Sequence, residues 1–163
     1  MTEAEALAAL RGDDRARAAR AEAALWAMWC RSGRAELDAR LAEAIAAMER
    51  REFAASERLL TALIEAAPGW AETWNKRATV RYLATDYAGA IADCQETLRR
   101  TPHHFGALAG QGLCHTALEQ YGPAAALFRR ALEVHPHLDA VRHSRRLSRL
   151  SRGGRGPWRS SPA

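Results

Sequence analysis

The sequence predicts an all-α protein built as an α-solenoid, in which three helix-turn-helix repeats stack between an N-terminal and a C-terminal capping helix. Two recurrences predict this architecture. Prolines return every 34 residues, at Pro68, Pro102 and Pro136. Aromatic residues keep the same interval, at Phe53, Tyr87 and Tyr121. A constant period of this length is typical of helix pairs that bury their apolar faces against neighbouring pairs.

The proline positions divide the chain into three parts. Residues 1–36 are predicted to form an N-terminal helical cap, residues 37–138 hold the three repeats, and residues 139–163 form a C-terminal cap helix and an Arg-rich disordered tail. The repeats are residues 37–70, 71–104 and 105–138. Each is expected to hold two helices, because a proline cannot continue a helix and therefore closes the second one.

The N-terminal cap is predicted as one helix from Asp14 to about Arg31. One of the two aspartates at its start is a suitable N-cap, and Gly33 stands just past its expected end. A solenoid cannot seal its own end, so we expect this helix to cover the first repeat. Its two tryptophans, Trp26 and Trp29, are interpreted as packing residues of the cap, with a ligand site as the alternative.

Small residues mark the place in each repeat where the two helices cross closely. The first helix carries Ala44, Ala78 and Gly112 there. The second helix carries Ser56, Ala90 and Ala124. A larger side chain at either position would push the helix axes beyond their normal separation of about 8–10 Å. The positions therefore support three repeats in the same register.

The C-terminal end combines a short apolar pattern with a strong positive charge. Val141, Leu147 and Leu150 are spaced to lay one helix against the last repeat, and no periodicity follows Gly153. Residues 1–139 hold 17 Lys and Arg against 19 Asp and Glu, whereas residues 140–163 hold seven arginines and no acidic residue. This tail is either a solubilising segment or a salt-sensitive binder of nucleic acid or another anionic surface.

The combined pattern resembles the tetratricopeptide repeat (TPR). In residues 71–104 the matching positions are Trp74, Ala78, Asp86, Tyr87, Ala90, Ile91, Leu98 and Pro102. Residues 105–138 follow the same pattern, and residues 37–70 match more weakly. The chain further resembles small single-domain TPR proteins of bacteria and plastid-bearing organisms. The resemblance implies a right-handed solenoid that acts as a protein-interaction adaptor or scaffold and not as an enzyme.

In the resembled family the first helices of the repeats line a concave groove that holds a segment of a partner protein. The resemblance therefore implies a protein or peptide partner in this groove. The partner-binding residues it implies are Leu41, Ile45, Asn75, Lys76, Thr79, Tyr82 and Leu113. The alternative for the three aliphatic residues among them is that they pack against neighbouring helices.

Some members of the family grip the carboxylates of chaperone tails with a clamp of Lys, Asn and Arg. This chain departs from that pattern. Leu41 and Ile45 stand where the first Lys and Asn would be, Lys76 replaces an Asn, and Gly106 and Gly110 replace a Lys and an Arg. A carboxylate would find too few donors to offset its desolvation. No dicarboxylate-clamp binding of chaperones is therefore expected.

The sequence contains no motif that indicates catalysis, a cofactor or a metal. It lacks a nucleophile elbow, a phosphate-binding glycine loop and a paired acid–base motif, so we expect no catalytic residue. The histidines of the pairs His103-His104 and His135-His137 do not have the spacing of metal ligands on one helical face. They are interpreted as solvated turns between repeats.

Cysteines and hydropathy bear on the compartment. Three cysteines without a C-x-x-C pair favour reduced thiols in a core. No apolar run is long enough for a membrane span, and the first 24 residues hold five acidic residues where a signal peptide needs an apolar stretch. A soluble cytoplasmic protein is therefore expected.

Overall fold

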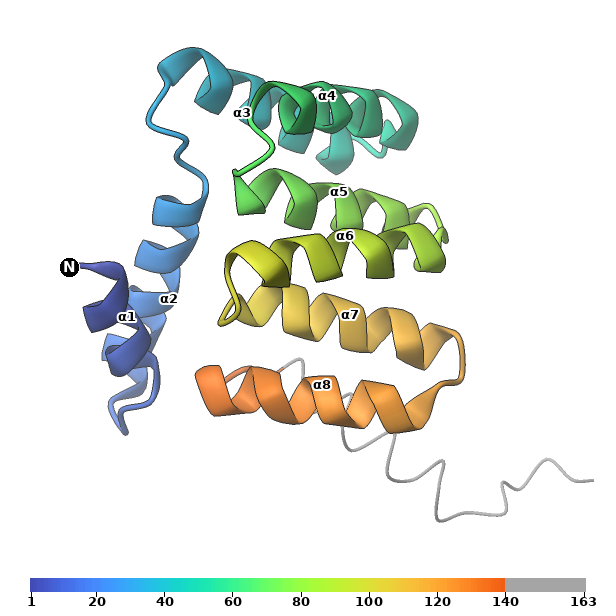
Figure 1. Cartoon of the computed structure of the whole chain (residues 1–163). Helices are drawn as coiled ribbons and strands as arrows, with labels where there is room; N and C mark the ends of the chain where they lie inside the picture. Colours follow the sequence, from blue (N-terminus) through green and yellow to red (C-terminus); the bar gives the residue numbers. More distant parts are fainter. Residues whose placement is uncertain (140–163) are drawn as a thin grey trace, which may run out of the picture.

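The computed structural model describes residues 1–139, and within them it contains eight helices and no strand (Figure 1). The helices are α1 Glu3–Leu10, α2 Arg15–Trp29, α3 Ala35–Glu49, α4 Phe53–Ala66, α5 Ala71–Leu83, α6 Tyr87–Arg100, α7 Phe105–Ala117 and α8 Tyr121–Val134. Helices α3 to α8 form three antiparallel pairs that stack in chain order (Figure 1). The predicted all-α repeat architecture is confirmed. The predicted C-terminal cap and tail lie outside the described residues.

The turn within each pair repeats the same backbone geometry. Arg51, Thr85 and Glu119 adopt the left-handed region, with φ of 62°, 65° and 58°. In each turn the residue after the left-handed one donates its backbone N–H to the carbonyl five positions earlier in the chain, as from Asp86 to Arg81 at 2.8 Å. This bond satisfies a carbonyl that the end of the helix would otherwise leave unpaired. The first helix of every repeat therefore ends at the same position.

The small residues predicted at the crossings lie where the helices approach most closely. A Cβ atom on Gly112 of α7 would lie 2.5 Å from Phe128 Cε1 of α8. In the first pair, the hydroxyl of Ser56 donates to the Ala44 carbonyl at 2.7 Å, and both residues are fully buried. Ser56 therefore fits the same close crossing as the alanines because its hydroxyl has a partner.

A buried ion network joins the first and second pairs. Asp93 of α6 is 2% exposed and accepts two hydrogen bonds of 2.8 Å from the guanidinium of Arg77 on α5. Arg81 adds a third bond at 3.0 Å, and Arg77 also donates to Thr61 Oγ1 of α4 at 3.1 Å. Because the network spans three helices, it fixes the position of one repeat on the next.

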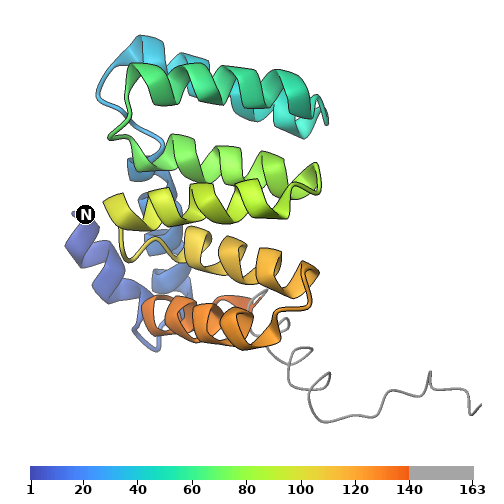
Figure 2. The same cartoon turned by 45° about the vertical axis from the view of Figure 1, so that its right-hand side comes forward.

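The N-terminal region differs from the prediction in content and place. Besides α2, which begins after the N-cap Asp14 as predicted, it contains α1, and the two form a hairpin. The hairpin crosses the repeat helices instead of lying parallel to them (Figures 1 and 2). Its Leu10 and Leu25 share an apolar cluster with Phe105 of α7. The region was expected to cover the first repeat; it contacts that repeat through Cys30 and the Trp29 carbonyl, but its main apolar cluster lies at the third repeat.

Candidate interaction groove

A pocket of about 330 Å³ lies on the face formed by the first helices of the second and third repeats. Thr79, Tyr82 and Leu83 line it from α5, and Ala109, Gly110 and Leu113 line it from α7. Cys94 of α6 and Cys114 of α7 complete its wall. Most of these side chains are apolar, so the pocket offers hydrophobic contact and few hydrogen-bond partners.

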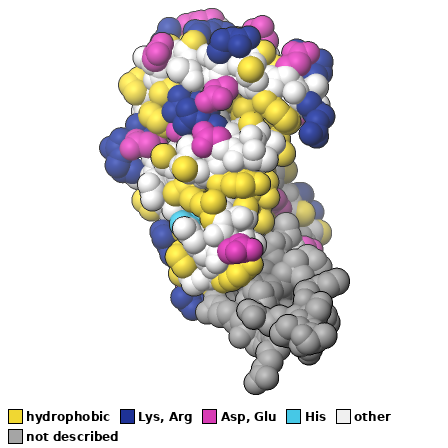
Figure 3. Space-filling model, turned by 90° about the vertical axis from the view of Figure 1, so that its right-hand side faces the viewer, with side chains coloured by type: hydrophobic (Ala, Val, Ile, Leu, Met, Phe, Trp, Pro, Cys, Tyr) yellow, Lys and Arg dark blue, Asp and Glu magenta, His cyan; other side chains and the backbone are white. Residues whose placement is uncertain are grey.

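Hydrophobic side chains also reach the surface at the end of the molecule where the turns within the repeats lie. Leu83, which lines the pocket, is 42% exposed, and Leu118 is 41% exposed. Figure 3 views this end and shows hydrophobic side chains in a band at mid-height, with charged side chains gathered above them. Leu83 therefore extends the apolar lining of the pocket to the surface, whereas Leu118 lies outside the pocket.

Four of the seven residues predicted to bind a partner line this pocket, and three do not. The four are Asn75, Thr79, Tyr82 and Leu113. Leu41 is 1% exposed and packs in the apolar cluster of the first repeat, so it is no contact residue. Ile45 is partly buried against the same cluster. Both aliphatic residues therefore pack against the first repeat, and neither lines the pocket.

Two polar candidate residues, Lys76 and Asn75, are engaged inside the chain. Lys76 Nζ lies 3.2 Å from Glu72 Oε1 and 5.1 Å from the centroid of the Trp26 ring. Asn75 is 6% exposed and its Nδ2 donates to the same carboxylate at 3.1 Å. Buried Glu72 therefore engages both side chains, and of the two only Asn75 lines the pocket.

Glu72 also receives a buried histidine. His104 Nε2 lies 2.9 Å from Glu72 Oε2, and both side chains are fully buried. His104 Nδ1 accepts a hydrogen bond from the Ala107 amide at 3.0 Å, so Nε2 carries the ring proton and donates a hydrogen bond to the carboxylate. Burial raises the pKa of Glu72, but the hydrogen bond from His104 and the charge of Lys76 outweigh it, and the pKa is lowered.

The histidines at the turns between repeats hold the N-terminal hairpin. His103 Nε2 lies 3.0 Å from Glu3 Oε1, and His135 Nε2 lies 3.1 Å from Glu22 Oε2. His137 Nε2 donates to the carbonyl oxygen of Gly12 at 2.8 Å. His104 stacks on Trp29 at a centroid distance of 4.1 Å. The interpretation of these turns as merely solvated is wrong, since two of the four histidines are buried.

Trp26 of α2 covers the first turn of α7. A Cβ atom on Gly106 would lie 2.5 Å from Cη2 of the indole. The Trp26 ring also meets the rings of Trp29, His104 and Phe105 edge-on, at centroid distances of 5.4 to 5.5 Å. The hairpin therefore occupies the N-terminal ends of the first helices, and the pocket described above lies further along them.

The buried thiols do not add nucleophilic chemistry to the pocket. Cys94 is 2% exposed and Cys114 is 1% exposed. Burial raises the pKa of both thiols, that of Cys114 to about 11. A thiol with a raised pKa remains protonated at neutral pH and is a poor nucleophile.

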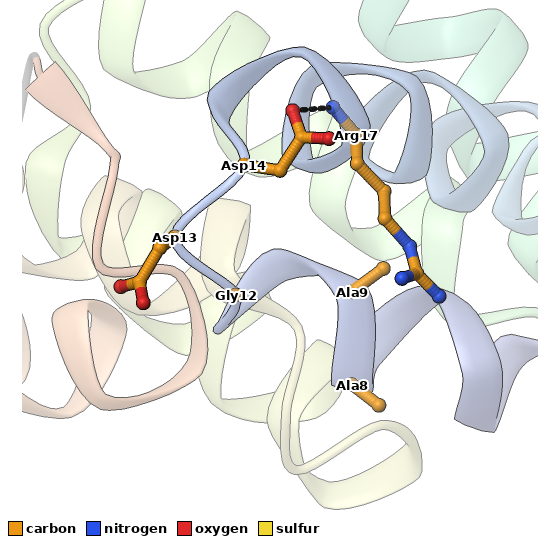
Figure 4. A pocket seen from close by; sticks show the side chains of 6 residues that line it. All are labelled: Ala8, Ala9, Gly12, Asp13, Asp14 and Arg17. Atoms are coloured by element: carbon orange, nitrogen blue, oxygen red, sulfur yellow. Dashed lines mark hydrogen bonds between the residues drawn. The ribbon is translucent and has the colours of Figure 1, made fainter.

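A second pocket, of about 240 Å³, lies at the turn between α1 and α2 (Figure 4). Its polar groups are Asp13, Asp14 and Arg17, and all three residues are exposed. Asp14 Oδ1 accepts a hydrogen bond from the Arg17 amide at 2.9 Å (Figure 4), and this bond lowers the pKa of Asp14. The pocket is therefore explained by the capped start of α2.

Two screens of the described residues concern other classes of site. Within residues 1–139, no group of three or more His, Cys, Asp or Glu side chains is arranged to hold a metal ion. In the same part of the chain, no helix has the length and hydropathy needed to cross a membrane.

The family model of the tetratricopeptide repeat matches residues 41–105 and 75–139, which together span more than half of the chain. A TPR repeat-containing protein of Rhizobium etli is 34% identical over 82 residues. That alignment covers 50% of this chain and 40% of the relative.

Solved TPR domains share the fold at lower identity. The Sgt2 TPR domain from Aspergillus fumigatus superposes with a TM-score of 0.71 at 20% identity, covering 80% of this chain and 90% of that one. The first TPR of Spaghetti (RPAP3), bound to the HSP90 peptide SRMEEVD, gives 0.70 at 16% identity, covering 72% and 94%. The TPR2B domain of yeast Sti1, in complex with an Hsp70 peptide, gives 0.66 at 18% identity, covering 71% and 97%.

Proposed function

Because the chain belongs to the tetratricopeptide-repeat family, we propose that it is a non-catalytic adaptor that binds a segment of a partner protein in the pocket between α5 and α7. The pocket carries this proposal, since it is an apolar hollow of about 330 Å³ on the face formed by the first helices. Two structural neighbours, the Spaghetti and Sti1 domains, were solved with HSP90 and Hsp70 peptides. Their complexes support a peptide as the class of ligand.

The charge around the pocket favours an apolar segment over a carboxylate terminus. Lys76 is already paired with Glu72, and Gly106 and Gly110 provide no cationic side chain. An anionic group brought into the pocket would lose its water without gaining a matching partner. The proposed ligand is therefore a stretch of chain that inserts apolar side chains, and the acidic tails bound by chaperone clamps are not expected to bind.

The test is affinity capture with the full-length chain and matched leucine variants. Leu113 lines the pocket and Leu118 does not, so Leu113→Ala and Leu118→Ala remove the same atoms from different places. We expect Tyr82→Ala and Leu113→Ala to lose the captured protein and Leu118→Ala to retain it, while all three keep their helical circular dichroism. Equal capture by Leu113→Ala and the parent would refute the pocket as the binding site.

A deletion of residues 140–163 tests the second candidate function. Seven arginines without an acidic residue in this segment favour nucleic acid or another anionic surface. The adaptor proposal predicts that the deletion leaves capture through the pocket unchanged. Loss of all bound material on deletion, together with strong weakening by salt, would instead assign the binding to the tail.

A further inference from the structure

The contact between Trp26 and Gly106 shows how the face formed by α5 and α7 receives a side chain from a crossing helix. With no Cβ at position 106, the indole reaches the backbone of α7, because a methyl group there would lie 2.5 Å from the ring. Lys76 Nζ lies above the ring, 5.1 Å from its centroid. We call this arrangement, formed by Gly106, Lys76 and the indole, the Trp26 seat.

One helical turn further along α7, Gly110 offers a second opening of the same kind. Four residues of helix advance about 6 Å along the axis. Within the described part of the chain, a Cβ atom on Gly110 would meet one neighbour within 4 Å outside its own helix, Cys94 Sγ at 3.7 Å. Gly106 and Gly110 both line the pocket, so the pocket continues directly from the Trp26 seat.

The walls of the pocket suit an aromatic ring. Tyr82 stands on one side, its own ring 5.7 Å from that of Tyr87, and aromatic rings attract one another at such distances. Cys94 and Cys114 contribute sulfur, which also makes favourable contacts with aromatic rings. At about 330 Å³ the pocket lies near the lower end of the usual size of ligand sites, which suits one large side chain.

We propose that the pocket over Gly110 is a seat for an aromatic side chain of a partner α-helix, which lies beside α2 and repeats the way Trp26 packs over Gly106. The proposal rests on the proposed function and specifies its ligand. Continuity with the α2 contact supports a helix, because α2 already crosses these helices as one (Figure 2), and Gly106, which Trp26 covers, also lines the pocket.

Designed peptides test this proposal on the full-length protein. The probes are three 16-residue peptides of alanine, glutamate and lysine with no net charge: one with a central tryptophan, one with alanine in its place, and one with the tryptophan and a neighbouring proline that breaks the helix. Binding is followed by amide chemical shifts of the protein. We expect the helical tryptophan peptide to shift the signals of Gly110 and Leu113 and to bind at least tenfold more tightly than the other two.

Two variants of α7 and one control locate the binding. Gly110→Ala places a methyl group in the seat at an ordinary contact distance and should weaken binding several-fold without disturbing the fold. Gly110→Leu should abolish binding. Gly122→Ala is the control, since a Cβ atom there meets nothing within 4 Å and the residue does not line the pocket. Unchanged binding by both Gly110 variants would refute the seat.

Other outcomes contradict specific parts of the proposal. Equal binding of the proline peptide would refute the helix, and equal binding of the alanine peptide would refute the aromatic side chain. Trp158 belongs to the segment of residues 140–163. If the tryptophan peptide binds the Trp158→Ala variant but not the parent protein, the chain's own tail, and not a partner, fills the seat. If Tyr82→Ala loses a captured protein but the peptides do not discriminate, the proposed function stands and this inference fails; if neither effect appears, both fail.

Discussion

Two alanine substitutions one turn apart on α7 affect stability in two ways that can be told apart. Both change the helix propensity of α7, but only one of them places a methyl group against α2. Gly106→Ala and Gly110→Ala remove the same backbone freedom, and alanine favours a helix over glycine by about 0.8–1 kcal/mol. At Gly110 the new methyl group has room, so the variant should be more stable by up to about 1 kcal/mol. At Gly106 the methyl group would lie 2.5 Å from Trp26, so α2 must shift.

The cost at Gly106 follows from overpacking, which is typically about 1–3 kcal/mol. Trp26 has little freedom to yield, because Lys76 covers its face and the rings of Trp29 and Phe105 meet its edges. After the gain in helix propensity, Gly106→Ala should be destabilised by up to about 2 kcal/mol. The two variants should therefore differ in the free energy of unfolding by about 1–3 kcal/mol.

The assay is urea unfolding, followed by circular dichroism for the helices and by tryptophan fluorescence for the hairpin. Gly106→Ala should move the midpoint to lower urea, and its fluorescence should change already in the folded state because the environment of Trp26 changes. Gly110→Ala should move the midpoint to higher urea with unchanged fluorescence. If both variants are stabilised equally, α2 does not press on α7, and the account of the Trp26 seat is wrong.

Three further predictions concern stability. Asp93→Ala leaves Arg77 and Arg81 without their buried carboxylate and should cost about 3–5 kcal/mol in urea unfolding; a loss below about 1 kcal/mol would contradict the network. Thr85→Gly relieves a β-branched residue at φ 65° and should raise stability by about 1 kcal/mol, seen as a higher Tm; a lower Tm would show that the turn is not strained. The pKa of Glu72 is lower in the folded protein than its ordinary value of about 4.5, so the ionised carboxylate stabilises the fold. This stabilisation is fully present above the ordinary pKa and is lost as the pH falls through the lower pKa of the folded state. The Tm of the parent should therefore fall more steeply than that of Glu72→Gln between about pH 5 and 3, and parallel curves would exclude this contribution.

The repeats could be predicted from the sequence because their physical requirements recur at a fixed spacing. Every close crossing needs a small residue: a Cβ atom on Gly112 would press on Phe128, and Ala78, at the same position of the second repeat, is 3% exposed. Every second helix is closed before a proline such as Pro102. Local steric rules repeated three times reinforce one another, so the register was predicted together with the fold.

The hairpin could not be placed from the sequence because its contacts occur once and join residues far apart. Trp26 meets Lys76 and Gly106, which are 50 and 80 residues further along the chain, and no second copy of the pattern indicates the pairing. Helix α1 did leave a local signal. Thr2 and Glu5 form a capping box, with bonds of 3.2 and 2.7 Å, and a Thr three residues before a Glu indicates such a start.

The same difference explains which of the candidate binding residues line the pocket. Thr79, Tyr82 and Leu113 line the pocket because their position within the repeat turns them toward this face. The availability of Lys76 depended on Glu72 and Trp26, and the burial of Leu41 depended on the packing of the first repeat. A position in the repeat thus predicts direction, whereas its neighbours decide whether a side chain is available to a ligand.

The hairpin places α2 over part of the face formed by α5 and α7, where we propose that a partner binds. Trp26 covers the end of the face nearest Gly106, and the histidine contacts at His135 and His137 fasten α2 and the turn before it to the third repeat. In the proposed complex, a partner helix beside this fixed α2 meets a surface that is already ordered, so less conformational entropy is lost on binding. Because α2 covers one end of this face, the part that remains open is the pocket over Gly110. A partner should therefore be selected by one well-fitting side chain and by its packing beside α2, and less by charge along an extended segment.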